Sequence, residues 1–287
     1  RKTMSRVNTI SIGLLVVGVL TNIGYAESGK DQFNLFNPTP REMMREMSTD
    51  RPDKTESAYT VDAGHYQMEA SLVDYTYDHR QSIQSDERSD NFSVAPINLK
   101  VGLFNNMDLQ LMINPYLNER SRGDGDSERK TGFGDIQNRL KINLWGNDGG
   151  QTAFAIMPFI KYPTNTHDLA NDAIESGIIL PLAVALPGDW KMGVMTEFDF
   201  NQNDQENDYT EYINSITFGH QIVGDLGGYV EFFSSFNDEE DSDWVGTVDL
   251  GLTYGLSDDF QLDGGVNIGV TNSADDFNPF LGCSIRY

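Results

Sequence analysis

The sequence predicts an all-β protein: a transmembrane, antiparallel, up-and-down β-barrel of about 12 strands with both termini on the periplasmic side. Three observations lead to this prediction. Apolar and polar residues alternate along most of the chain, the alternating segments are longer than ordinary strands, and the connections between them are alternately short and long. Helical periodicity is nearly absent except at residues 40–47, where we expect two helical turns.

The composition excludes several other classes of protein. The chain has 287 residues, with 20 Lys and Arg against 44 Asp and Glu, and its formal net charge of −24 argues against nucleic acid as a partner. One cysteine excludes a disulfide scaffold and a cysteine-built zinc site. The 38% of hydrophobic residues are too many for a disordered chain.

The N-terminal residues have the pattern of a secretory signal peptide. Arg1, Lys2 and Arg6 precede an apolar run at 10–20, and small residues at 24 and 26 fit cleavage after Ala26. The alternative is a membrane anchor, but the run of 11 residues is shorter than the roughly 20 that a spanning helix needs. We therefore predict a cleaved signal peptide over 1–26 and export to the outer membrane of a Gram-negative cell.

Period-two alternation predicts the strands. In residues 97–103, for example, apolar side chains at odd positions alternate with Asn98, Lys100 and Gly102. Most predicted strands have 10 to 13 residues, whereas ordinary strands average about 5 to 6 and tilted membrane-crossing strands need about 9 to 11. The predicted strands are 64–78, 91–103, 107–117, 134–145, 151–162, 176–186, 190–201, 209–222, 226–236, 244–254, 260–270 and 278–287.

The connections favour a membrane barrel over a soluble β-sandwich, which is the alternative. Connections after odd strands are long (79–90, 118–133, 163–175) or intermediate (202–208, 237–243, 271–277), and those after even strands are tight (104–106, 146–150, 187–189, 223–225, 255–259). A sheet in lipid must close on itself because unpaired edge groups find no water there. Its polar face then lines the lumen, which explains a mean hydropathy of only −0.44 in a membrane protein. Aromatic residues near the predicted strand ends suit the two interfacial girdles of such a barrel.

The last strand ends on an aromatic residue, Tyr287, with Ile285, Cys283 and Leu281 on the same face. This pattern resembles the C-terminal signal that the barrel-assembly machinery recognises. We therefore expect that machinery and outer-membrane lipids as partners, with Cys283 facing lipid as a small apolar residue.

The inward faces of the predicted strands carry charged residues that we expect to line a pore. One wall leans basic and the other acidic, which would place a transverse field across a selective, water-filled passage. The alternative is that these charges pair and close the lumen. The predicted pore-lining residues are Lys100, Arg139, Lys141, Lys161, Lys191, Glu197, Asp199, Glu211, Glu231, Asp249 and Asp263.

Residues 27–57 precede the barrel, which we place at 58–287, and form a separate N-terminal segment. Two interpretations stay open: a plug that folds into the lumen, which the mixed charges of the segment suit, or a loose periplasmic extension. Acidic clusters at 204–208, 237–243 and around Asp124, Asp126 and Glu128 are either solvated, repulsive loops or sites for a hard divalent cation. The cluster at 124–128 lacks the remaining ligands of a calcium loop, and we predict no metal site.

We predict no catalytic residues and no cofactor. The sequence has no G-x-S-x-G, H-E-x-x-H, P-loop or dinucleotide motif. Some outer-membrane barrels hydrolyse lipids with a Ser-His pair, so the four histidines (His65, His79, His167, His220) define the enzyme alternative.

Three stretches resemble a known family: residues 48–72, 132–145 and 153–164, with Thr49–Asp53 and Gly132–Asp135 as the most specific parts. The family is the outer-membrane transporter family named after the meta-cleavage pathway of phenol degradation, and the resemblance covers nearly everything after residue 30. Ala58 stands where we expect a proline. The resemblance implies a barrel with a transport role and gives no binding residues. We therefore expect a channel for passive passage of small solutes, including aromatic or poorly soluble ones; the alternative is a closed barrel with a structural or surface-interaction role.

Overall fold

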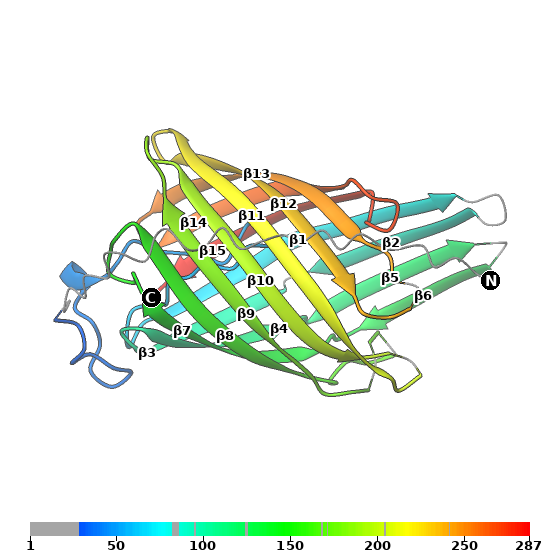
Figure 1. The fold of residues 1–287 in the computed structure, drawn as a ribbon, viewed down its shortest axis with the longest axis horizontal. Helices are drawn as coiled ribbons and strands as arrows, with labels where there is room; N and C mark the ends of the chain where they lie inside the picture. The colour runs from blue at the N-terminus through cyan, green and yellow to red at the C-terminus, as the bar shows by residue number, and fades with distance from the viewer. Residues whose placement is uncertain are drawn as a thin grey trace, which may run out of the picture.

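Long strands make up most of the chain in the computed structural model, which describes residues 29–81, 86–94, 96–123, 126–167, 169–170, 172–203, 205–240 and 242–287 (Figure 1). The predicted signal peptide lies outside these residues. The strands are β1 (Tyr66–Gln81), β2 (Asp86–Val94), β3 (Ile97–Phe104), β4 (Met107–Ile113), β5 (Tyr116–Gly123), β6 (Asp126–Gly132), β7 (Ile136–Trp145), β8 (Thr152–Tyr162), β9 (Glu175–Ala185), β10 (Lys191–Gln202), β11 (Asp208–Val223), β12 (Leu226–Asn237), β13 (Val245–Ser257), β14 (Phe260–Gly269) and β15 (Phe277–Arg286).

The strands form a closed antiparallel barrel of 12 crossings, which confirms the predicted fold class. Three crossings are interrupted near one rim and therefore count as two strands each: β2 with β3, β4 with β5, and β6 with β7. The sheet closes where β15 pairs with β1, from Gln67 opposite Arg286 to Tyr77 opposite Phe277. Closure gives the backbone groups of the terminal strands partners, as a hydrocarbon environment requires.

Alternation of the side chains separates an apolar outer face from an inner face that is mostly polar. Leu109, Leu250 and Leu281 point outward and are 42%, 43% and 59% exposed. The adjacent Asp108 and Asp249 point inward and are fully buried. A chain with this arrangement presents hydrocarbon to lipid and keeps its charges inside.

Exposed aromatic residues gather near the two rims of the barrel. At the rim with short turns, which we call the turn end, they include Tyr66, Phe104, Trp190, Tyr254 and Tyr287; at the opposite rim, the loop end, they include Phe200, Phe236, Trp244 and Phe277. Amphipathic rings are favoured at both interfaces of a membrane, so these two belts mark its boundaries.

The predicted tight turns are present at the turn end, but two of the predicted long loops are wrong. The 79–90 region is a hairpin, since β1 runs to Gln81 and β2 starts at Asp86; the 118–133 region is likewise the hairpin of β5 and β6. These strands continue beyond the rim as a four-stranded extension in the order β1, β2, β5, β6, seen at the right of Figure 1. Their residues are largely polar on both faces, so no apolar alternation marks them as strands, although backbone pairing continues.

The N-terminal segment enters the molecule at the turn end (Figure 1). From residue 29 onward, its one helical element is the 3₁₀ turn η1 (Arg41–Met43) rather than the two helical turns expected over 40–47. Met44 is already extended, and the backbone N–H of Arg45 donates to Asp62 Oδ2 at 3.0 Å. A tertiary hydrogen bond therefore replaces the helical one. Among the described residues, no helix has the length and apolar character to span a bilayer.

Candidate functional site in the barrel lumen

The N-terminal segment crosses the inside of the barrel, and its contacts there define the candidate site. Backbone N–H groups of Asp50 and Arg51 donate to Glu69 on β1 at 3.0 and 3.1 Å. Asn143 on β7 donates to the carbonyl oxygen of Ala58 at 2.8 Å. Other residues of the segment reach β10 to β14, as described below. We call residues 48–62 the lumen segment.

The acidic side chains of the lumen segment meet the predicted basic wall. Asp50 accepts hydrogen bonds from both Lys100 on β3 and Lys141 on β7, and the Lys141 Nζ to Asp50 Oδ1 distance is 2.6 Å. Lys100 also forms an ion pair with Glu69. All four side chains are at most 5% exposed. Two positive charges are thus neutralised by two carboxylates in a buried cluster.

Arg139, the third member of the basic wall, pairs with another acid of the same segment. Its Nη1 donates to Glu56 Oε1, and both side chains are largely buried. Burial raises the pKa of Glu56 to about 7, the Asp50 carboxylate adds to the increase, and Arg139 opposes it.

The basic side chains of the lumen segment meet the predicted acidic wall. Arg51 Nη2 lies 2.7 Å from Asp263 Oδ1 on β14, and Lys54 Nζ lies 3.3 Å from Asp249 Oδ2 on β13. Glu231 on β12 accepts hydrogen bonds from the backbone N–H groups of Lys54 and Thr55, both at 2.8 Å. The segment therefore bridges the two walls instead of leaving them facing across water.

Burial and charge set the protonation of two further acids in the segment. Burial acts to raise the pKa of Asp50, but the ammonium groups of Lys100 and Lys141 outweigh it and hold that pKa well below its usual range. Burial, reinforced by Glu231, raises the pKa of Asp53 well above its ordinary value. Asp50 is consequently ionised at neutral pH, whereas Asp53 is favoured in its neutral form.

Of the other predicted pore-lining residues, Lys161 and Glu211 lie toward the loop end of the lumen and Lys191 lies at the turn end. Lys161 pairs with Glu175 and, together with Glu211, lines a cavity of about 480 Å³ at the loop end. Lys191 is exposed at the turn end, while Glu197 and Asp199 occupy neighbouring inward positions on β10. A second cavity, of about 540 Å³, lies at the turn end between residues 41–47 and the wall.

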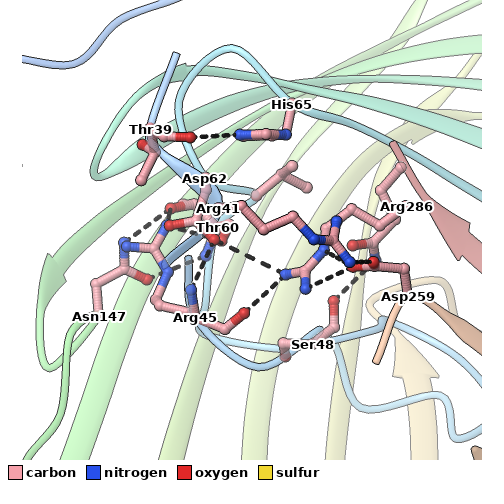
Figure 2. A network of polar contacts seen from close by, with 12 residues as sticks. Thr39, Arg41, Arg45, Ser48, Thr60, Asp62, His65, Asn147, Asp259 and Arg286 are labelled. Carbon is pink, nitrogen blue, oxygen red and sulfur yellow. Dashed lines mark hydrogen bonds and ion pairs between the residues drawn. The ribbon is translucent and has the colours of Figure 1, made fainter. Parts of the chain in front are cut away.

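A polar network fixes the segment where it enters the barrel (Figure 2). Arg45 donates to Asn105 Oδ1 at 2.8 Å, to Asp148 Oδ1 at 2.9 Å and to the carbonyl oxygen of Thr60 at 3.2 Å. Arg286 donates to Asp259 Oδ1 at 2.8 Å, which ties the last strand to the same rim. Backbone packing adds to this anchor, because a Cβ on Gly102 would lie 2.0 Å from the carbonyl oxygen of Asp62.

Sequence reasoning missed two parts of the site. Lys54 and Glu56 were not recognised as partners of the walls, and an apolar cluster of Met157, Phe159, Ile179 and Met195, with Ile213 packed against it, lies inside the lumen. The cluster joins the lumen segment, since the backbone N–H of Glu56 donates to Met195 Sδ at 3.4 Å. The signal was present in residues 153–160, which are apolar on both faces of β8.

The remaining candidates for chemistry are dispersed. His65 contacts the carbonyl oxygen of Thr39, His167 that of Thr131 and His220 that of Gly188. Across the residues that the structure describes, no group of three His, Cys, Asp or Glu could hold a metal ion. Of the acidic clusters weighed above, Asp124, Asp204 and Asp241 lie outside the described residues.

The fold places the protein in the class of outer-membrane β-barrels. A crystal structure of an outer-membrane channel from Pseudomonas putida F1 is similar with a TM-score of 0.61 at 10% identity, over 84% of this chain and 100% of that one. The translocator domain of the autotransporter NalP from Neisseria meningitidis has a TM-score of 0.49 at 8% identity, over 77% of this chain and 88% of that one. Comparison with curated protein sequences finds no match.

The family follows from the sequence itself. Residues 49–287 match the family described as "Putative MetA-pathway of phenol degradation", and the chain belongs to it. This confirms the resemblance stated above. The match begins at Thr49, so it includes most of the lumen segment as well as the barrel.

Proposed function

We propose that the protein is an outer-membrane channel through which small solutes pass down their own gradients, and that the lumen segment is its constriction. The observation that carries this proposal is the bridging of both charged walls by residues 50–56. A structural barrel has no need for a separate polar segment in its lumen, because side chains fill small barrels without one. The cavities at the two ends then act as vestibules on either side of the constriction.

The lumen supports passage of solutes that combine apolar and polar groups, including aromatic ones. The apolar cluster around Met157 and Phe159 lies among charged residues on the same inner surface. Sites for small organic molecules have this character, with apolar walls that provide contact area and a few polar groups that orient the ligand. No energy coupling is required for such passage.

Export and assembly complete the proposal. Residues 1–26 serve as a cleaved signal peptide, the turn end faces the periplasm because short turns lie there in outer-membrane barrels, and the exposed Tyr287 on β15 is read by the barrel-assembly machinery. The protein acts without a cofactor and without catalytic residues.

Planar-bilayer conductance of the purified protein tests the channel. We expect discrete openings that become larger or more frequent when residues 29–62 are deleted, and also in the single variants Lys141→Ala and Asp249→Ala. Solute uptake into liposomes provides a second readout. If a folded barrel shows neither conductance nor uptake in any of these forms, the channel proposal is wrong.

The alternative, a closed barrel with a surface-interaction role, is favoured by one observation: the four-stranded extension beyond the loop end (Figure 1). This role predicts unchanged liposome permeability on deletion of residues 29–62, so the same measurement separates the two.

A further inference from the structure

The outer face of the four-stranded extension carries a cluster of arginines that the channel does not use. Arg122 pairs across the sheet with Arg88, and Arg120 pairs with Arg129. Residues directly opposite one another share a face, and here that face is the one that carries Tyr75 and Phe92. All four arginines are exposed. We call Arg88, Arg120, Arg122 and Arg129 the arginine cluster.

The arrangement is electrostatically unfavourable without a partner. Like charges directly opposite one another on neighbouring strands destabilise their pairing, and here two such pairs are adjacent. In the part of the chain that the structure describes, no ion pair joins Arg120, Arg122 or Arg129 to a carboxylate. Arg129 instead donates to the amide oxygen of Asn118 at 3.2 Å.

Among the side chains of this face that the structure describes, one is a carboxylate, and it is already engaged. Asp90 lies opposite Arg120 and accepts a hydrogen bond from Tyr75 Oη at 2.7 Å. One negative charge leaves Arg120, Arg122 and Arg129 with a net positive charge. This concentration stands out in a chain whose net charge is −24.

The position of the cluster relative to the aromatic belt indicates what could bind there. Tyr116 and Phe92 are outward-facing at the loop end, at 38% and 37% exposure. Arg120 and Arg88 each lie four positions farther from the barrel along their strands, which corresponds to roughly 13 Å at 3.3 Å per residue. Strand tilt reduces this height, so the guanidinium groups reach the level of lipid headgroups rather than hydrocarbon.

We propose that the arginine cluster binds the phosphate groups of an anionic lipid of the outer leaflet, a phosphorylated glycolipid whose acyl chains pack on the aromatic belt below. Guanidinium groups bind phosphate oxygens in bidentate geometry, and the bond is charge-assisted. The phosphates of one headgroup would neutralise Arg120, Arg122 and Arg129 and remove the repulsion between Arg120 and Arg129. The inference rests on the outer-membrane placement given under the proposed function, but it does not depend on an open lumen.

The experiment measures binding of bisphosphorylated lipid A to the full protein in detergent, by native mass spectrometry and by titration. The variant Arg120→Gln/Arg122→Gln/Arg129→Gln and the single variant Arg129→Gln test the cluster. Lys130→Gln is the matched control, because Lys130 is the next residue on β6 and lies on the opposite face, where it pairs with Glu119 across the strands. Circular dichroism checks that each variant keeps its strands.

We expect the wild type and Lys130→Gln to bind lipid A equally, Arg129→Gln to bind it several-fold more weakly, and the triple variant at least tenfold more weakly. Dephosphorylated lipid A should bind the wild type as weakly as the triple variant binds lipid A. Equal binding by the folded triple variant, or equal binding of the dephosphorylated lipid, overturns the proposal. Displacement of lipid A by equimolar inorganic phosphate also overturns it, since the site would then be one for free phosphate. Conductance measured on the same variants should be unchanged, so a failure here is distinguishable from a failure of the channel function.

Discussion

Removal of the Asp50 carboxylate should release the lumen segment from the basic wall. In the variant Asp50→Asn, the two ammonium groups of Lys100 and Lys141 stay buried and both lose their ion pair with Asp50, while Lys100 keeps its ion pair with Glu69. Breaking a buried ion pair by removing one partner costs about 3–5 kcal/mol, because the other charge is left uncompensated. Each 1.4 kcal/mol is a factor of ten, so the ratio of docked to undocked segment should fall roughly a hundredfold to a few thousandfold.

Proteolysis measures this ratio directly. Trypsin cleavage after Lys54 requires the segment to leave the lumen, and its rate follows the population of the undocked form when opening is fast relative to cleavage. The peptide that ends at Lys54 is quantified by mass spectrometry, so cleavage elsewhere in the chain does not interfere. We expect Asp50→Asn to be cleaved at this site at least a hundredfold faster than the wild type, with a matching increase in channel opening.

Two comparisons make the result specific. Asp135→Asn is the matched control, since Asp135 accepts its hydrogen bonds from Asn165 at the loop end, away from the lumen segment. The double variant Asp50→Asn/Lys141→Met should be cleaved more slowly than Asp50→Asn alone, because one uncompensated charge is gone. Unchanged protection of Lys54 in a folded Asp50→Asn barrel would refute the reasoning that this cluster holds the segment.

Three further predictions concern the same lumen. Because burial raises the pKa of Glu56 to about 7, the docked state holds a proton that the undocked state releases near pH 4.5. Docking should therefore weaken, and channel opening should increase, as the pH rises from about 5 to 7. Glu56→Gln should reduce this pH dependence of channel opening, even though Arg139, Asp50 and the nearby lysines remain. The variant Gly102→Val should displace the carbonyl oxygen of Asp62 and raise trypsin cleavage after Lys54, with the barrel's melting temperature nearly unchanged; a wild-type cleavage rate would contradict the close approach. Glu211 and Glu239 line the loop-end cavity together with a single lysine. The variant Glu211→Gln/Glu239→Gln should therefore move the cation-to-anion permeability ratio toward unity in reversal-potential measurements. An unchanged ratio would show that ions do not pass through this cavity.

The barrel could be predicted because its constraint is local. A strand that separates lipid from a polar lumen must alternate at every second residue, and residues 97–103 and 260–270 show this without reference to their neighbours. The alternation of short and long connections along the chain predicted the closed, up-and-down topology. The prediction of a loop at residues 79–90 is wrong for the same reason: beyond the membrane neither face of a strand needs to be apolar, so a paired strand there shows no alternation.

The contacts of the lumen segment could not be predicted because they are set by closure of the whole barrel. Arg51 meets Asp263 across 212 positions of the sequence, and Lys54 meets Thr247 across 193. The sequence does give the charge of each residue, including the excess of basic residues on one wall and of acidic residues on the other. Which residue of the segment faces which wall depends on the register of strands β1 and β12 to β14, and that register follows from pairing rather than from composition.

The chemistry of the lumen segment suits the proposed reversible constriction better than it suits a permanent core. A segment that fills a lumen permanently would be stabilised most by apolar side chains, because the desolvation cost of a buried ion pair offsets most of its electrostatic attraction. Residues 50–56 instead contain three acids and two bases, of which Asp50 and Glu56 meet the basic wall and Arg51 and Lys54 meet the acidic wall. Such a match gives one specific docked position with a small net free energy, because water can replace the same partners once the segment leaves. The walls that it exposes on leaving are the polar surfaces that a water-filled passage requires.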